Sequence, residues 1–210
     1  MDKNVRVWFG QRKKLLLRAA IIGIALFVCL KLFMAYYALG WTFYGQECFP
    51  YRLWFIEKGV IPQKGEYVYF RNVKIEGKWA RYSWVKRIAG VGGDTIEVRE
   101  LGKWIKYSAR VPVSLAEASG WRGKYQAFVP WFSKPLAVRA HVIVRSAAGE
   151  STVFPAFETD TTGKQLPLVK PGPIGKGKYF VAGDSPRSYD SRYWGTIDEK
   201  EIIGKAFPLF

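Results

Sequence analysis

The sequence contains few of the side chains that bind metals or act as common catalytic bases. Its 210 residues include one histidine, His141, and two cysteines, Cys29 and Cys48. A single chain therefore cannot assemble a Cys/His zinc cluster, and neither an HExxH nor a P-loop motif is present. A Ser-His-Asp triad would have to use His141, which lies in the strand-like run 139–144 and is interpreted as structural. We therefore expect neither a metal ion nor an organic cofactor.

Acidic side chains are also scarce. The chain has 17 acidic and 33 basic residues, which gives a formal net charge of +16. Such an excess attracts nucleic acid or anionic lipid. Hydrophobic residues make up 49%, yet the mean hydropathy is only −0.07, so the apolar residues are concentrated locally. A chain of this length has room for one membrane anchor and one sizeable domain.

One apolar run, residues 19–39, is long enough to cross a bilayer as a helix, and Lys31 is its only charged residue. Basic residues precede it: Lys3, Arg6, Arg12, Lys13, Lys14 and Arg18. By the positive-inside rule, residues 1–18 are cytoplasmic and residues 40–210 are exported. This topology accounts for the basic N-terminus without nucleic acid, so we expect membrane lipid as a partner and no nucleic acid.

A cleaved signal peptide is the alternative interpretation of the run. Its length argues against cleavage, as does the aromatic stretch that follows in place of an Ala-x-Ala site. These aromatics are typical of a membrane interface but would also suit the core of a first strand: Trp41, Phe43, Tyr44, Phe49, Tyr51, Trp54 and Phe55. A bridge between Cys29 in the span and Cys48 outside it is excluded by their separation, so Cys48 is predicted to be an unpaired thiol in an oxidising compartment.

Short apolar segments bounded by glycine turns follow the run, with little helical periodicity. Strands are predicted at 65–70, 84–89, 95–98, 178–182 and 202–207. The pattern favours a mainly β exported domain. Residues 101–177 contain seven prolines and are predicted to form a β-rich insertion or subdomain, with a strand at 141–145 and a short helix within 113–120.

Two glycine-containing segments carry the most specific signal. Residues 84–96 (WVKRIAGVGGDTI) and 183–195 (GDSPRSYDSRYWG) follow the apolar run in this order. They resemble the lysine-base and Gly-Asp…Asp-Ser-Arg segments of type I signal peptidases, the S26 peptidases. The resemblance covers residues 46–59, 65–98 and 178–207, and it implies a membrane-anchored endopeptidase that uses a nucleophile and a lysine.

The segment expected to hold the nucleophile departs from the usual pattern. Residues 46–54 (QECFPYRLW) are most similar to the conjugative-transfer branch, the TraF-type pilin peptidases. In that branch a serine is followed by one residue, a proline and then a basic residue before an apolar pair. Cys48 occupies the serine position. It lies nine positions after Leu39, a stretch that reaches at most about 30 Å, so the nucleophile is expected close to the membrane surface.

The resemblance also implies roles for individual residues. Cys48 would be the nucleophile and Lys86 the general base, a variant of the Ser-Lys dyad. A lysine in water is protonated at neutral pH, so a lysine base needs burial among apolar groups, which favours the neutral amine. The oxyanion donors would be the backbone N–H of Cys48 and the side chain of Gln46. The supporting residues follow in the second segment: Ser188 bonded to Lys86, Asp190 and Arg192 as a structural ion pair with Arg87 as a third member, and Asp184 fixing the turn.

These observations predict an endopeptidase that processes an exported precursor, and the conjugative-branch features favour a prepilin. A cysteine nucleophile would form a thioester, which amines capture more readily than water does, so joining of pilin ends is predicted beside hydrolysis. The alternative is an inactive scaffold with the same fold in a conjugation or secretion apparatus. The expected partners are the precursor, membrane lipid and that apparatus.

Overall fold

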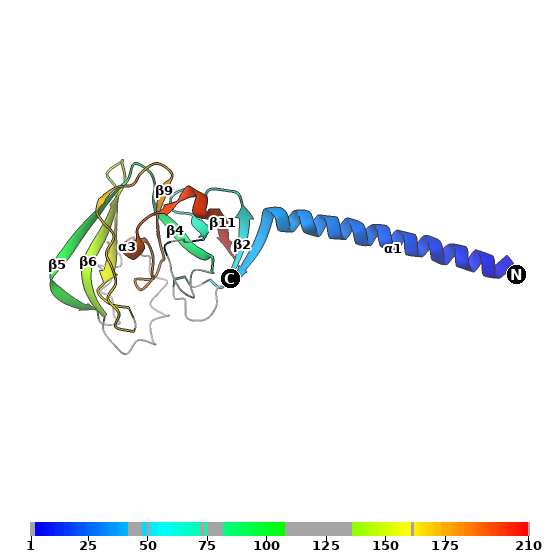
Figure 1. Ribbon diagram of the computed structural model, residues 1–210, viewed down its shortest axis with the longest axis horizontal. Helices are drawn as coiled ribbons and strands as arrows, with labels where there is room; N and C mark the ends of the chain where they lie inside the picture. Colours follow the sequence, from blue (N-terminus) through cyan, green and yellow to red (C-terminus); the bar gives the residue numbers. More distant parts are fainter. Residues whose placement is uncertain are drawn as a thin grey trace. The chain divides into compact units, whose positions relative to one another are not determined.

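The computed structural model describes residues 3–41, 48–49, 51–71, 74, 82–107, 136–160 and 162–209. These residues form one long N-terminal helix and a strand-rich domain (Figure 1). The contacts divide the chain into two compact units, residues 1–38 and 39–210. The predicted fold class, a mainly β domain after a single apolar helix, is confirmed.

The helix α1 (Lys3–Tyr36) is continuous and includes both the basic N-terminal residues and the apolar run. Its segment Leu15–Tyr36 has 22 residues, is apolar enough to cross a membrane, and buries none of its side chains within the protein. At 1.5 Å per residue this segment measures about 33 Å, close to the hydrocarbon thickness of a bilayer. The predicted span 19–39 extends beyond the helix, because the chain becomes extended at Tyr37. Apolarity alone does not mark that change.

The larger sheet of the domain has seven strands in the order β1-β2-β11-β3-β4-β9-β10. Their bounds are β1 (Tyr37–Trp41), β2 (Leu53–Lys58), β11 (Ile202–Pro208), β3 (Tyr67–Phe70), β4 (Trp84–Gly90), β9 (Lys178–Ala182) and β10 (Ile197–Asp198). The C-terminal strand β11 pairs antiparallel with both β2 and β3. β4 lies between β3 and β9, also antiparallel to each. Segments from both ends of the domain therefore meet in one sheet.

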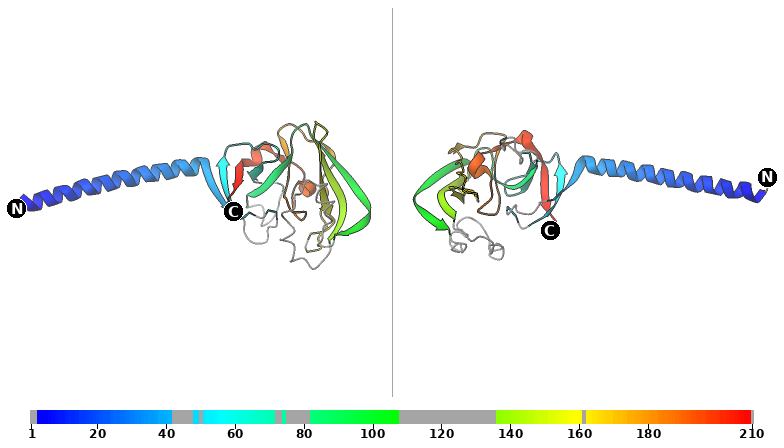
Figure 2. Two further views of the ribbon diagram at one scale, coloured as in Figure 1. Left: turned by 180° about the vertical axis from the view of Figure 1, so that it is seen from behind. Right: turned by 60° about the horizontal axis from the view of Figure 1, so that its bottom comes forward.

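A second sheet has four strands in the order β7-β6-β5-β8. Its members are β5 (Thr95–Tyr107), β6 (Leu136–Arg145), β7 (Ser151–Phe157) and β8 (Gly172–Pro173). The long strands β5 and β6 lie side by side in both views of Figure 2 and pair antiparallel. The sheet begins at Thr95, six residues before the predicted start of the insertion at 101. The helix predicted within 113–120 lies outside the described residues.

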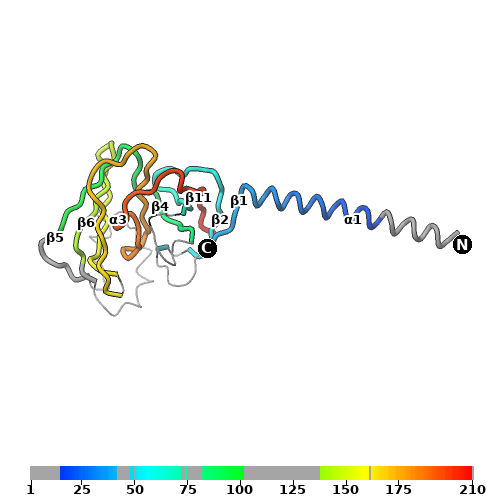
Figure 3. Tube along the Cα trace, viewed as in Figure 1, coloured from blue at the N-terminus to red at the C-terminus, as the bar shows by residue number. Residues whose placement is uncertain are grey.

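The two sheets share a core. Most of its buried members come from β5, β6, β7 and β9, and one comes from the single-turn helix α3 (Ser191–Trp194). Val169 and Ile174 come from the segments on either side of β8. The buried members are Ile96, Ala140, Val142, Val144, Phe154, Ala156, Val169, Ile174, Phe180, Ala182 and Tyr193. Strand side chains alternate between faces, so Val181 of β9 joins a second cluster with Val68, Phe70, Ile88 and Ile197. Figure 3 traces the C-terminal segment through α3, which contacts both β9 and β7, and on to β11.

Candidate active site

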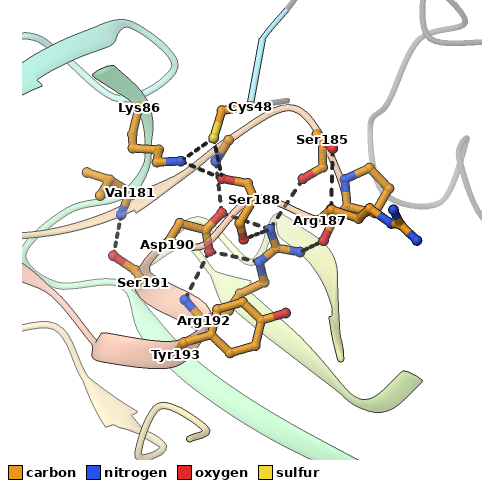
Figure 4. A network of polar contacts seen from close by, with 12 residues as sticks. Cys48, Lys86, Val181, Ser185, Arg187, Ser188, Asp190, Ser191, Arg192 and Tyr193 are labelled. Atoms are coloured by element: carbon orange, nitrogen blue, oxygen red, sulfur yellow. Dashed lines mark hydrogen bonds and ion pairs between the residues drawn. The ribbon is translucent and has the colours of Figure 1, made fainter. Parts of the chain in front are cut away.

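Three side chains from distant parts of the sequence meet in the domain. The Nζ atom of Lys86 lies 2.7 Å from Sγ of Cys48 and 2.6 Å from Oγ of Ser188. The Ser188 hydroxyl also donates to the Cys48 sulfur at 3.4 Å (Figure 4). The amine is therefore in hydrogen-bond contact with both a thiol and a hydroxyl.

Lys86 occupies the third position of β4 and is completely buried. Because strand side chains alternate, it shares a face with the buried Ile88, while the neighbouring residue Arg87 points to the other face. Its register partner on β3 is Val68, which is also buried. Its Nζ atom lies 5.6 Å from the centre of the Trp84 ring. β4 thus places the amine of Lys86 in buried surroundings that exclude water.

Cys48 is half-buried and lies ahead of β2. Two contacts fix its position. Its carbonyl accepts a hydrogen bond from the backbone N–H of Ser185 at 3.2 Å. The next residue, Phe49, meets the rings of Trp54 and Tyr67 edge-on, with centroids 5.5 and 5.1 Å apart. Aromatic pairs of this geometry stabilise beyond the area they bury, so the cysteine is held between a loop and an aromatic cluster.

Ser188 lies in the loop of residues 183–190, which connects β9 to α3. Gly183 begins the loop, and its N–H donates to the Asp190 carboxylate at 2.9 Å. An added Cβ at Gly183 would lie 2.2 Å from Oγ of Ser188 and 3.2 Å from Cβ of Cys48. Only glycine therefore leaves room for Ser188 to approach the lysine.

Arg192 holds the shape of this loop. It is fully buried and forms a bidentate ion pair with the fully buried Asp190, with Nε and Nη2 each 2.8 Å from a carboxylate oxygen. Its Nη1 and Nη2 groups also donate to four backbone carbonyls, those of Pro155 (2.6 Å), Pro186 (2.7 Å), Ser188 (2.8 Å) and Ser185 (3.3 Å). The Arg192 guanidinium thus connects β7 with the loop that contains Ser188.

Burial and mutual attraction act in opposite directions on the pKa values of Asp190 and Arg192. Burial by itself raises the pKa of Asp190, but the charge and hydrogen bonds of Arg192 outweigh it, and the net pKa of Asp190 lies below its ordinary value. Desolvation lowers the pKa of Arg192, but the charge and hydrogen bonds of Asp190, together with the nearby Tyr193 and Cys48, outweigh it, and the net pKa of Arg192 is raised. Asp190 also caps α3 by accepting from the backbone N–H of Arg192 at 3.2 Å.

Arg87 does not join the Asp190–Arg192 pair, contrary to the prediction. Because it faces away from Lys86, its Nη2 donates instead to Asp184 and to the hydroxyl of Tyr67, both at 2.7 Å. Tyr67 is its register partner on β3, and its hydroxyl in turn donates to Asp184 at 3.3 Å. Burial, helped by the Asp184 charge, raises the pKa of Tyr67 to about 12. Asp184, predicted to fix the turn, therefore connects the loop to β3 and β4.

Gln46, the expected second oxyanion donor, is outside the described residues. His141 lies on β6 opposite Arg99, and burial together with the Arg99 charge lowers its pKa. Within the described ranges, no group of three or more His, Cys, Asp or Glu side chains is placed to hold a metal ion.

Sequence reasoning missed two contributors to the site. Tyr67 lies in a predicted strand, but its link to Arg87 depends on the pairing register of β3 and β4. The space at Gly183 depends on the fold of the loop. A signal for Gly183 was present, since glycine directly after a buried strand is typical of close backbone approach.

A buried amine in contact with the thiol of a partly buried cysteine on a β scaffold is compatible with a nucleophile–lysine dyad. The family model described as "Signal peptidase, peptidase S26" matches residues 12–210, nearly the whole chain. The chain therefore belongs to the S26 signal peptidase family, a family of peptidases.

Curated relatives are similar over short stretches. A signal peptidase I of Buchnera aphidicola subsp. Acyrthosiphon pisum (strain APS) is 47% identical over 38 residues, which is 18% of this chain and 12% of the relative. A signal peptidase I of Buchnera aphidicola subsp. Baizongia pistaciae (strain Bp) is 56% identical over 34 residues, 16% of this chain and 11% of the relative. In both cases the matched stretch spans only about an eighth of the relative's length or less.

Proposed function

We propose that this protein is a membrane-anchored endopeptidase that cleaves an exported precursor, with Cys48 as nucleophile and Lys86 as general base. The observation that carries the proposal is the contact, at 2.7 Å, between the amine of the completely buried Lys86 and the sulfur of the partly buried Cys48. This distance is within the reach that proton transfer between a base and a nucleophile requires.

In the acylation step the thiol proton passes to the Lys86 amine, and the sulfur attacks the scissile carbonyl carbon. The carbonyl oxygen gains the negative charge, which the backbone N–H of Cys48 would stabilise. Collapse of this intermediate breaks the C–N bond, and the Lys86 ammonium returns the proton to the leaving amine. The acyl group remains on Cys48 as a thioester. Ser188, bonded to the amine at 2.6 Å, keeps Nζ oriented while it changes protonation state.

Cys48 is a better candidate for the nucleophile than Ser188, although the lysine contacts both. Ser188 is only 2% exposed and lies against Gly183, where a peptide carbonyl has no access. Cys48 is half-exposed. A thiol is also more acidic and more nucleophilic than a hydroxyl near neutral pH.

The second step depends on what attacks the thioester. Water gives a linear product, and the amino group of a peptide gives a new peptide bond. The conjugative-branch pattern around Cys48 supports a prepilin as the substrate, with joining of its ends beside hydrolysis. The apolar helix Leu15–Tyr36 supports a single-pass anchor in a bacterial inner membrane. The basic residues before it support a cytoplasmic N-terminus and an extracytoplasmic catalytic domain, with a conjugation or secretion apparatus as neighbour.

Precursor processing by three variants tests the mechanism. Cys48→Ala and Lys86→Ala should each lower the cleavage rate by on the order of 10⁴-fold or more, as loss of a nucleophile or its base does elsewhere. Cys48→Ser keeps a nucleophile beside the amine and should retain measurable cleavage. Cys29→Ser is the matched control and should cleave at the wild-type rate. Full activity in Cys48→Ala would remove Cys48 from the mechanism.

The same assay separates the alternatives. A wild-type protein that recruits its partners but never processes a precursor would favour the scaffold, an alternative suggested by the cysteine in the family's serine position. If precursor is processed, mass spectrometry of the product distinguishes its two forms, because a cyclic product lacks one water relative to the linear one. The release of linear product alone would contradict end joining.

A further inference from the structure

We propose that Cys48 and Lys86 are a site of reversible oxidative cross-linking, in which a hydroperoxide converts the pair to a sulfur–nitrogen bond. The proposal concerns the same two residues as the proposed function. Formation of the bond requires only their geometry, whereas its effect on catalysis rests on the proposed function.

Few groups near Cys48 could react with its sulfur once the sulfur is oxidised. The chain contains one other cysteine, Cys29, which belongs to the apolar helix. The domain formed by residues 39–210 therefore has no second thiol that could resolve a sulfenic acid as a disulfide. Two side chains form hydrogen bonds to the sulfur: Lys86, with Nζ at 2.7 Å, and Ser188, with Oγ at 3.4 Å. Of these, only an amine is a good nucleophile toward a sulfenic acid.

The first step is oxidation of sulfur by two electrons. With the thiol proton on Lys86, the Cys48 thiolate attacks the hydroxyl oxygen of the hydroperoxide, and the O–O bond breaks. The second oxygen takes that proton from Lys86 and leaves as an alcohol or water, which returns Lys86 to the neutral amine. Cys48 is then a sulfenic acid. Cys48 is only partly buried, so a small oxidant can reach it, and a proton acceptor is already in contact with its sulfur.

The second step is condensation. The neutral amine of Lys86 attacks the sulfenic sulfur, the S–O bond breaks, and the hydroxyl leaves with one amine proton as water. The product is a sulfenamide, analogous to the known capture of sulfenic acids by backbone nitrogen. Because the amine is held against the sulfur, this intramolecular step should outrun a second, bimolecular attack by peroxide. Lys86 has an unbranched stem that can move its amine the short distance to bonding.

Reversal needs an external thiol. One thiol attacks the sulfur, releases the Lys86 amine and forms a mixed disulfide, and a second thiol restores free Cys48. Capture by the lysine therefore protects the sulfur from the irreversible sulfinic and sulfonic states. A single bond would remove both the nucleophile and the base, so peroxide should switch the peptidase off and reductant should restore it.

Mass spectrometry on the full-length Cys29→Ser protein in detergent, treated with hydrogen peroxide, tests the bond directly. We expect a species lighter by two hydrogens, a digest peptide pair joining Cys48 to Lys86, and recovery of the starting mass with dithiothreitol. Lys86→Met, similar in length but without the amine, should give sulfenic and then sulfinic acid and no cross-link; a thermal melt establishes that it is folded. Ser188→Ala retains both the thiol and the amine and should still cross-link.

Two results would overturn the proposal. One is peroxide-treated Cys29→Ser protein in which Cys48 is recovered only as sulfenic, sulfinic or sulfonic acid. The other is the same loss of two hydrogens in folded Lys86→Met, which would assign the bond to another nitrogen. Neither readout uses a substrate, so a cross-link in a protein without peptidase activity would support this inference while contradicting the proposed function.

Discussion

The missing side chain of Gly183 is what lets Ser188 reach Lys86. A methyl group there would lie 2.2 Å from Oγ and 2.5 Å from Cβ of Ser188, well inside contact distance. Gly183→Ala should therefore displace Ser188 from the amine and press on Cys48. Displacements of about 1 Å at reacting groups can cost on the order of 100-fold in rate. We expect a loss of that order in kcat for precursor cleavage, with a smaller effect on thermal stability.

Gly175→Ala provides a matched control for this substitution. Its added Cβ would meet only the Lys178 side chain, at an ordinary 3.6 Å. It should leave kcat and the melting temperature unchanged. A Gly183→Ala protein with wild-type kcat would show that the contact between Ser188 and Lys86 is dispensable.

Tyr67 connects the two parts of the site through its ring and its hydroxyl. The ring packs on Phe49, the residue after Cys48, and the hydroxyl accepts from Arg87 and donates to Asp184. Because its pKa is raised to about 12, the hydroxyl remains a donor at neutral pH. Tyr67→Phe keeps the ring and should cost about 0.5–1.5 kcal/mol of stability per hydrogen bond lost.

Tyr67→Leu removes the ring as well and should lower kcat more than Tyr67→Phe does. Denaturant unfolding and cleavage kinetics measure the two effects separately. Tyr69→Phe on the same strand is the control and should be neutral, since the Tyr69 hydroxyl makes no hydrogen bond to any residue that the structure describes. Equal kcat values for Tyr67→Phe and Tyr67→Leu would mean that Phe49 does not need the ring to position Cys48.

At the scale of elements, the loop of residues 183–190 and the helix α3 depend on one buried ion pair. The folded pKa of Asp190 lies below its unfolded value of about 3.9. The pair therefore contributes stability above that pH, and the contribution is lost as pH falls through the lower, folded pKa. Asp190→Asn leaves Arg192 charged and buried, which costs about 3–5 kcal/mol at neutral pH.

The same variant should flatten the acid limb of the stability profile, because position 190 no longer titrates. Thermal or urea unfolding of wild type and Asp190→Asn, at neutral pH and at steps down to acid, measures both effects. Asp198→Asn is the control, because the Asp198–Lys178 pair is exposed and worth little. An Asp190→Asn protein as stable as wild type at neutral pH would contradict the structural role of the pair.

At the scale of the whole molecule, the sequence predicted the elements better than their extents. The helix, the strands at 67–70, 84–90 and 178–182, and the C-terminal strand follow from apolar runs bounded by glycine. The prediction for β5 ended at 98, because a register shift between Glu100 and Ile105 interrupts the alternation of apolar residues. Periodicity cannot reveal a strand that continues past such an irregularity.

For the site, too, the sequence predicted some features and missed others: it predicted the residues but not all of their contacts. Cys48, Lys86 and Ser188 lie 38 to 140 positions apart, and only the family pattern could suggest that they meet. The partner of Arg87 could not be inferred, because it depends on which face of β4 each residue occupies and on the register with β3. A one-residue difference in that register would exchange the positions of Lys86 and Arg87.

The proposed topology gives the last prediction. Ile61 follows β2 and is 46% exposed, so a cysteine there would report the compartment of the domain, whereas Cys29 belongs to the segment proposed to span the bilayer. In a Cys48→Ser background, a membrane-impermeant maleimide should label Ile61→Cys in intact spheroplasts as fully as after lysis. Cys29 should remain unlabelled in both, because hydrocarbon excludes the charged reagent. Labelling of Ile61→Cys only after lysis would place the domain in the cytoplasm, where an exported precursor could not reach Cys48 and the proposed peptidase would have no substrate.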